Sequence, residues 1–193
     1  SFVSRGLGDV YKRQLMNCGA SMGEGYGPMI VAKQGVSEEE AKSSPIAVPG
    51  LKTSAYLGIR LCWGDLQYEV VPFDEIIPRI LDDTYKSGLI IHEGQLTYVD
   101  HDLNVLANLG IWWNEKTGGL PMPLGGNVVR RDLGQQMMED ITMYTKMSIE
   151  HSIANPDTAL EFAKKWGRGI DDDTNREFVT MLSLIHISEP TRH

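Results

Sequence analysis

An alternation of strand-like and helix-like segments between residues 46 and 91 limits the possible folds of this chain more than any other feature. Residues 46–48 and 88–91 are short apolar segments, and residues 66–71 alternate between apolar and polar side chains; both patterns are typical of strands. Residues 53–63 and 74–82 separate them and have helical patterns. Strands separated by helices predict right-handed crossovers and a mainly parallel sheet covered on both faces. We expect the three strands to be neighbours in this sheet.

A histidine follows the last of these strands. His92 and Glu93 come directly after the apolar residues 89–91. Ligands of open parallel sheets bind beyond the carboxyl ends of the strands, so His92 is a candidate functional side chain. A lone histidine after an apolar run is more often a hydrogen-bonded structural residue. We favour a structural role for Glu93, because adjacent residues of a strand point to opposite faces.

Thr53 and Ser54 follow the first strand and a Pro-Gly turn, at the predicted start of the first helix. The free amides and the positive dipole end of a helix can hold a carboxylate, even in an acidic protein. Simple N-capping explains both hydroxyls more often than ligand binding does. Gly125 and Gly126 could let the backbone approach a ligand or could form a bend between two lobes, and the sequence favours neither.

The charge of the chain indicates the class of partner. The 193 residues have a net charge of −8, which argues against nucleic acid and anionic membranes, since both bind basic surfaces. Cys18 and Cys62 fit neither a metal site nor a disulfide framework, and we expect no cofactor. No apolar segment is long enough to insert into a membrane. In a chain this acidic, any anionic ligand must be held by local groups.

The segments that flank the alternation suggest a second lobe. Residues 28–33 predict a strand, and residues 124–131 could form a strand that leaves the lobe. Residues 37–44 are charged and loop-like, so we interpret them as a connector at a lobe boundary. The terminal residues 1–14 and 182–193 resemble translated sequencing-adapter read-through, and we set both aside as foreign.

Two helices are predicted after the departing strand. The first begins with a capping-box-like pair, Asp132 and Gln135, and its methionines indicate core packing. The second opens at Asn155 and Pro156. The residues expected on the buried face of the first helix are Leu133, Met137, Ile141, Tyr144 and Ser148.

Four motifs, in this order, resemble the 1,4-dihydroxy-6-naphthoate synthase family. They are GPMIVAK at 27–33, IAVPGLKTSAYL at 46–57, GLIIHEGQLTY at 88–98 and NLGIWWNEKTGGLPMPLGGNVVRRDLG at 108–134. The resemblance extends over residues 15–181. It implies an α/β fold with two lobes, similar to type II periplasmic binding proteins, in which helices flank mainly parallel sheets.

The resemblance also implies a function. Enzymes of this family act in the cytoplasm of bacteria, in the futalosine route of menaquinone biosynthesis. They are carbon-carbon lyases that convert cyclic dehypoxanthine futalosine to 1,4-dihydroxy-6-naphthoate without a cofactor. The family's proposed general base matches His92. The residues implied to bind the carboxylate substrate are Thr53, Ser54 and Ala55, with Gly125 and Gly126 expected in the same cleft.

The family's chain is longer at both ends. The resemblance therefore implies that residues 15–42 and 121–181 belong to an incomplete first lobe and residues 43–120 to a nearly whole second lobe. We expect such a fragment to be inactive. Two alternatives stay open: a chorismate dehydratase, which is not expected to carry the I-I-H-E run, and a solute-binding protein without catalysis. The sequence does not indicate an oligomeric state.

Overall fold

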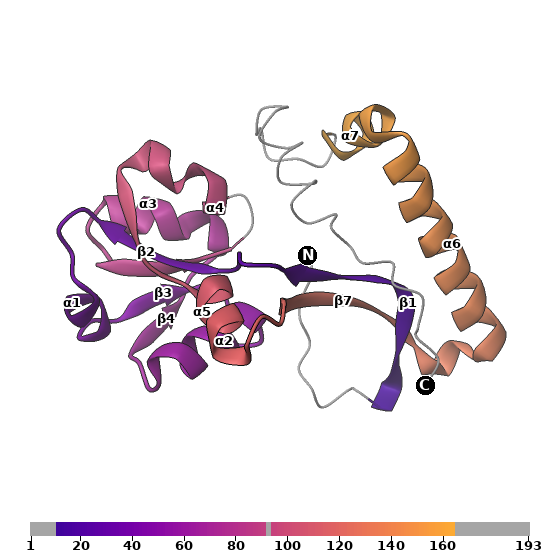
Figure 1. The fold of residues 1–193 in the computed structure, drawn as a ribbon, viewed down its shortest axis with the longest axis horizontal. Helices are drawn as coiled ribbons and strands as arrows, with labels where there is room; N and C mark the ends of the chain where they lie inside the picture. The colour runs from indigo at the N-terminus through magenta and orange to yellow at the C-terminus, as the bar shows by residue number, and fades with distance from the viewer. Residues whose placement is uncertain (1–10, 92–93, 165–193) are drawn as a thin grey trace. The chain divides into compact units, whose positions relative to one another are not determined.

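The computed structural model describes residues 11–91 and 94–164, which form two compact units (Figure 1). The first unit is built from Gly23–Leu124. The second contains the described residues 11–22 and 125–164. The chain therefore passes between the units twice, next to Gly23 and next to Leu124.

The first unit contains a five-stranded sheet in the order β4-β3-β5-β2-β6. The three predicted strands are β3 (Ile46–Val48), β4 (Tyr68–Val70) and β5 (Ser87–Ile90), and they are neighbours as expected. β3 pairs in parallel with both β4 and β5. The described helices between these strands are α2 (Ser54–Trp63) and α3 (Ile76–Leu81), the latter preceded by a 3-10 turn, η2 (Phe73–Glu75).

The sheet is mixed: four of its five strands run in one direction, as expected for a mainly parallel sheet, and one strand is reversed. The predicted strand β2 (Met29–Lys33) lies between β5 and β6 (Leu103–Asn108) and pairs antiparallel with both. The direction of β2 follows from the place where the chain enters the first unit. β2 arrives from the second unit at the edge where the carboxyl ends of β5 and β6 lie, so it must run away from that edge.

Both faces of this sheet are covered, as Figure 1 shows. Ile30, Ile46 and Leu89 point to a buried cluster with Ile59 of α2 and Leu109, the first residue of α5 (Leu109–Thr117). The alternate strand residues contact α3 on the opposite face, in a second cluster that contains Val31, Ala47, Ile76, Ile80 and Ile90. Burial on both faces explains why these strands are continuous apolar runs.

Residues 37–44 contain a short helix, so our interpretation of them as a loop at a lobe boundary was wrong. α1 (Glu38–Lys42) begins with a capping box in which Ser37 Oγ accepts from the Glu40 amide at 3.2 Å and the Glu40 carboxylate accepts from the Ser37 amide at 3.1 Å. Ala41 is fully buried. β2 is an internal strand of the five-stranded sheet, and α1 follows it in the same unit. The part of residues 15–42 that starts at Gly23 therefore lies with residues 43–120, not in a separate lobe.

The second unit contains most of a two-stranded sheet and two helices. β1 (Arg13–Gly23) lies beside β7 (Met122–Arg130), which is the predicted departing strand (Figure 1). α6 (Gln135–Ala154) and α7 (Pro156–Lys164) follow, and α7 has Pro156 in its first turn as predicted. β1 starts at Arg13, so its first two residues belong to the first terminal segment that we set aside.

The start and the buried face of α6 differ from the prediction. Gly134 is the N-cap, and Asp132 lies in a 3-10 turn, η4 (Arg131–Leu133), where it accepts from Arg130 Nε at 2.9 Å instead of capping the helix. The small buried cluster Met16, Cys18 and Val129 packs against Met138, Ile141 and Ile149. Of the face expected to be buried, Ile141 alone packs on this cluster, whereas Leu133, Met137, Tyr144 and Ser148 are exposed.

Candidate functional site

One edge of the five-stranded sheet collects the segments in which the candidate residues lie. Met29, at the start of β2, pairs with Ile90 of β5 and with Asn108 of β6. The carboxyl ends of β3, β5 and β6 therefore meet at this edge. The loop of residues 49–53 leaves β3 here and leads into α2.

His92 and Glu93 lie outside the described residues. The described chain ends β5 at Ile90 and resumes at Gly94, the first residue of a short helix, α4 (Gly94–Thr97). Ile91, which precedes the histidine, packs against the cluster on the α2 face of the sheet. The role of His92, and its distance from the start of α2, remain predictions.

Thr53 is the N-cap of α2, and its hydroxyl is fully engaged in local contacts. Oγ1 accepts from the Tyr56 amide at 3.0 Å and donates its hydrogen to the Gly50 carbonyl at 2.8 Å. A hydroxyl has one hydrogen, so Thr53 cannot donate to a ligand carboxylate while it holds Gly50. The geometry thus supports capping as the role of this side chain.

Ser54 and Ala55 contribute to the helix start in different ways. Ser54 Oγ donates to the Leu124 carbonyl at 3.0 Å, which ties the helix to the point where β7 leaves the first unit. Ala55 is 1% exposed and its methyl group belongs to the buried cluster, so only its amide could reach a ligand. The first turn of a helix lacks intrahelical acceptors for its amides. Thr53 uses the Tyr56 amide, and the Ser54 and Ala55 amides are the donors this turn can offer an anion.

Gly125 and Gly126 lie in extended backbone of β7, in the second unit. A Cβ added to Gly125 would meet only Ser21 Cβ at 4.0 Å, and one on Gly126 would meet Leu15 Cδ1 at 3.4 Å. Neither position needs glycine for packing within its own unit. Their place in a shared cleft with Thr53, Ser54 and His92 remains a prediction.

The sequence analysis missed a second helix start at the same sheet edge. Asn108 caps α5: its Oδ1 accepts from the Gly110 amide at 3.0 Å and the Ile111 amide at 3.2 Å. A Cβ on Gly110 would lie 2.0 Å from the Tyr26 carbonyl oxygen, so the two backbones are in close contact. Burial, with a smaller effect of Glu24, raises the pKa of the Tyr26 phenol. The signal was available, because Asn108 stands before Leu109 and Gly110 at the end of an apolar run.

A groove of about 420 Å³ on the first unit has Asn108 in its wall and contains none of the predicted site residues. Its walls include Trp63 and Trp112, and Lys42 Nζ lies 4.8 Å from the centre of the Trp63 ring. Burial raises the pKa of the Cys62 thiol in its wall. Trp113, by contrast, packs on the core and donates from Nε1 to the Pro121 carbonyl at 3.1 Å, as expected for a core tryptophan.

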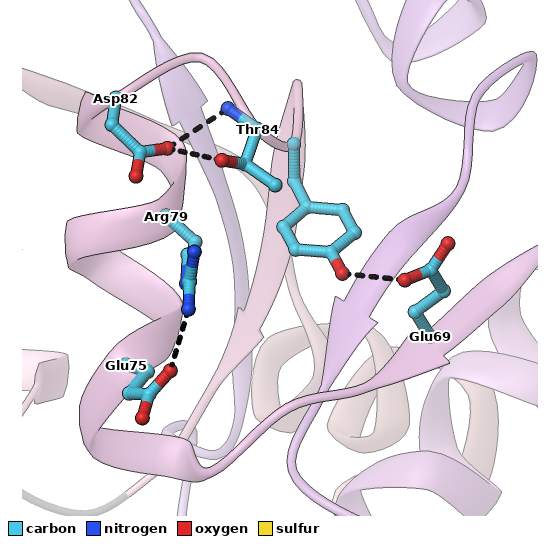
Figure 2. A network of polar contacts seen from close by, with 6 residues as sticks. Glu69, Glu75, Arg79, Asp82 and Thr84 are labelled. Carbon is cyan, nitrogen blue, oxygen red and sulfur yellow. Dashed lines mark hydrogen bonds and ion pairs between the residues drawn. The ribbon is translucent and has the colours of Figure 1, made fainter.

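The polar network in Figure 2 lies away from the candidate site and holds the chain before β5 in place. Asp82 accepts from the Thr84 amide and hydroxyl, and these bonds lower the pKa of its carboxyl group. Tyr85 donates to Glu69 at 2.6 Å, which raises the pKa of the phenol. Asp82, Thr84 and Tyr85 precede β5, at the opposite end of that strand from the candidate site.

Within residues 11–91 and 94–164, no three His, Cys, Asp or Glu side chains are grouped closely enough to hold a metal ion. None of the helices in this described part has the length and apolar character required to cross a bilayer.

Comparison with solved structures shows the fold. A protein of Archaeoglobus fulgidus is 41% identical and superimposes with a TM-score of 0.83, over 89% of this chain and 64% of that protein. A periplasmic sulfonate-binding protein of Methylobacillus flagellatus superimposes with a TM-score of 0.58 at 14% identity, over 90% of this chain and 54% of that one. The chain therefore has the α/β fold of periplasmic binding proteins.

Comparison with curated sequences identifies two related enzymes. The chain is 33% identical over 158 residues to the 1,4-dihydroxy-6-naphthoate synthase of Thermus thermophilus and 31% identical over 163 residues to that of Streptomyces coelicolor. These alignments cover 82% and 81% of this chain and 57% of each relative, so the chain spans little more than half their length.

The family described as menaquinone biosynthesis matches residues 10–191. This match includes parts of both terminal segments that we set aside as foreign, so the comparison does not support the boundaries we gave them. It also includes all the motifs on which the resemblance rests. The chain belongs to the menaquinone biosynthesis family.

Proposed function

We propose that this chain is part of a 1,4-dihydroxy-6-naphthoate synthase, a carbon-carbon lyase that converts cyclic dehypoxanthine futalosine to 1,4-dihydroxy-6-naphthoate in the cytoplasm. The observation that carries the proposal is the relation to two synthases at 31% and 33% identity within a family match over most of the chain. The geometry of the α2 start is compatible with it, because the substrate class is a carboxylate.

In the proposed mechanism, the start of α2 holds the substrate and His92 takes a proton from it. The amides of Ser54 and Ala55 and the positive end of the helix bind the carboxylate. Thr53 positions these amides by capping the helix and does not itself donate to the ligand. A neutral imidazole at His92 can accept a proton near neutral pH and start the elimination.

The activity test needs a full-length protein. We would insert this chain into the Archaeoglobus protein in place of the residues it matches, and measure release of 1,4-dihydroxy-6-naphthoate from cyclic dehypoxanthine futalosine. We expect turnover by this hybrid and none by the isolated chain, since an incomplete site neither positions the substrate nor excludes water. Binding without turnover by the folded hybrid would instead favour a solute-binding protein.

The proposed base is tested by His92→Ala in the same hybrid. Loss of a general base lowers kcat by about 10²- to 10⁴-fold while substrate binding is largely retained. The matched control is His101→Ala, because His101 is an exposed histidine at the end of the 3-10 turn η3 (Tyr98–His101). Near-normal turnover by the His92 variant would show that another group is the base.

A further inference from the structure

The groove on the first unit is lined by aromatic and charged side chains. Trp63, the last residue of α2, and Trp112 of α5 contribute their indole rings. Glu38 and Lys42 contribute charged groups from α1, and Glu115 contributes one from α5. Its volume of about 420 Å³ falls within the range of small-molecule sites, roughly 300–1,000 Å³. The groove therefore has the size and the composition of a ligand site.

Most of this groove lies away from the candidate site at the carboxyl ends of the strands. α1 follows β2, whose last residue, Lys33, pairs with Leu103 at the start of β6. This is the edge of the sheet opposite to the one where β5 and β6 end. α2 begins beside the candidate site and ends at Trp63, so the groove lies at the far end of this helix. A ligand of the groove would therefore bind apart from the substrate proposed for the start of α2.

The charges around the groove favour a cation. Two carboxylates, Glu38 and Glu115, and one ammonium group, Lys42, line it. Lys42 forms an ion pair with Glu38, one turn away on α1, so these two charges offset each other. Within residues 11–91 and 94–164, Glu115 takes part in none of the ion pairs. The charge left to attract a ligand is the carboxylate of Glu115.

The tryptophan rings attract the same kind of ligand. The face of an indole ring attracts an ammonium group that lies within about 6 Å of the ring centre. Lys42 Nζ lies 4.8 Å from the centre of the Trp63 ring, so one ring of the groove already holds a cation of the chain itself. In the described part of the chain, no ammonium or guanidinium group lies over the Trp112 ring.

Trp112 and Glu115 are neighbours on α5 and are held by the core. They stand three residues apart, which places them on one face of the helix, and both line the groove. The Trp112 ring lies 6.4 Å from that of Trp113, centre to centre, with the planes inclined by 56°. Trp113 is fixed in turn by the core and by its bond to the Pro121 carbonyl. A ring supported in this way loses little freedom when a ligand binds.

We propose that this groove binds a small organic cation whose charged group lies between the Trp112 ring and the Glu115 carboxylate. Its apolar part would contact Ile111, which lines the groove and is 48% exposed. The ring offsets part of the lost hydration of the cation, and the carboxylate supplies the opposite charge. An anion would be repelled and a neutral solute would gain neither contact, so the groove discriminates by charge. Binding of this cation does not depend on the reaction proposed for the family.

A basic side chain from a second copy of the chain fits the groove less well than a small molecule. Two copies repel each other, because each carries a net charge of −8. A stable contact between copies would also have to bury about 800 Å² per partner, far beyond the groove itself.

The first test compares two probes of the same shape. Choline carries a quaternary ammonium group, and 3,3-dimethylbutan-1-ol has a neutral carbon in place of the nitrogen. We expect the 193-residue chain to bind choline saturably in isothermal titration calorimetry and to bind the neutral alcohol at least about threefold more weakly. Equal binding of the two probes, or no saturable binding of choline, would overturn the proposal.

Substitutions on α5 should weaken the binding of choline. Trp112→Leu removes the ring and keeps an apolar side chain, so we expect a loss of about three- to thirtyfold in affinity. Glu115→Gln should cost up to about fivefold, and this difference should fade as salt is added. Glu161→Gln is the matched control, because it changes the net charge equally at an exposed position of α7 in the second unit. If both α5 variants bound choline as the control does, the assigned contacts would be wrong.

A third variant should change the affinity in the opposite direction. Lys42→Met removes the cation from the Trp63 ring and leaves Glu38 without its partner, so the groove becomes more negative. We expect this variant to bind choline more tightly than the wild type does. A general loss of structure cannot produce such a gain, and a weaker affinity of this variant would contradict the proposal.

Thiol modification measures the charge of the groove without a reversible ligand. Cys62 lines the groove and is partly exposed, whereas Cys18 is fully buried in the second unit and should stay unmodified. We would compare methanethiosulfonate reagents that carry an ammonium or a sulfonate group, each relative to its own rate with 2-mercaptoethanol. We expect the ammonium reagent to modify Cys62 faster, and choline to slow this reaction.

Two results of this measurement would overturn the proposal. One is an equal or higher relative rate for the sulfonate reagent. The other is protection of Cys62 in the absence of choline together with a doubled mass by light scattering, because that outcome assigns the groove to a second copy.

Discussion

The hydroxyl of Thr53 stabilises the start of α2 through two hydrogen bonds, one as acceptor and one as donor. Thr53→Val keeps the shape of the side chain and removes both bonds, which leaves the Tyr56 amide without its cap. We expect a loss of about 1 kcal/mol in the free energy of unfolding, the usual cost of removing such a cap. Urea denaturation followed by circular dichroism measures it.

Thr53→Ser is the matched control, because it keeps the oxygen and should retain most of the stability. In the full-length hybrid, the valine variant should also raise KM more than it lowers kcat, since misplaced helix amides bind a carboxylate less well. Equal stability of the valine variant and the wild type would show that the cap contributes nothing.

The candidate residues illustrate which roles a sequence can predict. Capping by Thr53 was predictable because the chemistry is local: a hydroxyl, a turn before it and an apolar helix pattern after it. The bond from Ser54 to Leu124 was not, since it joins positions 70 residues apart. The buried Ala55 methyl was equally hidden, because the resemblance implied a contact but not whether side chain or backbone makes it.

At the scale of elements, the close contact between the start of α5 and the chain before β2 depends on glycine. Gly110→Ala would place its Cβ 2.0 Å from the Tyr26 carbonyl, a backbone group that cannot rotate away. We expect a loss of about 1–3 kcal/mol, as for other overpacked sites. Gly125→Ala is the control, because its Cβ would meet nothing closer than 4.0 Å. Thermal unfolding compares the two, and an equal melting temperature for both variants would refute the close contact.

The capping box of α1 predicts an acid-sensitive contribution to stability. The amide and hydroxyl of Ser37 and the charge of Lys86 lower the pKa of the Glu40 carboxyl below its ordinary 4.5. A carboxyl whose pKa is lower in the folded state stabilises the fold above its unfolded pKa, and this contribution is lost as the pH falls through the folded pKa.

Glu40→Gln should therefore reduce stability at neutral pH and flatten its decline below about pH 4.5, the ordinary value for this carboxyl. Glu39→Gln is the control, because Glu39 lies in the same first turn and does not receive the Ser37 bonds. Melting temperatures between neutral pH and pH 3 compare them. If the two variants decline in parallel, the box does not contribute in this way.

The elements that the sequence predicted well are those with both a periodic pattern and local end signals. α2 has a threonine N-cap and Gly64 as its C-cap, and β3 and β5 are bounded apolar runs. α1 was missed because four of its five residues are charged and its single buried residue, Ala41, gives no visible period. The face of α6 was misassigned because periodicity shows that a stripe is apolar but not which partner covers it.

At the scale of the whole molecule, a local sequence pattern could not predict the direction of β2. A buried strand looks the same in a parallel and an antiparallel pairing when both of its faces are covered. Only the path of the chain, which enters the first unit at the edge where β5 and β6 end, determines that β2 is reversed. The same path places residues 29–42 with the five-stranded sheet.

That arrangement predicts that the first unit folds without the second. Gly23–Leu124 is one continuous stretch that contains the complete five-stranded sheet and both of its buried clusters. It also keeps the bond from Ser54 to Leu124. We expect a polypeptide of residues 23–124 to unfold cooperatively in urea and to give a dispersed NMR spectrum.

A shorter polypeptide of residues 23–120 is the control for this prediction. It lacks Met122, which is 3% exposed and whose methyl carbon lies 2.8 Å from the Cβ position of Gly58, in the contact between α2 and α5. Removing a fully buried methionine side chain costs about 2–5 kcal/mol, so the shorter polypeptide should unfold at a much lower urea concentration. If the two polypeptides were equally stable, Met122 would not be part of this core. If the longer one showed no cooperative transition, the first unit would depend on the rest of the chain, because the buried clusters of its own sheet would be too small to offset the loss of conformational entropy.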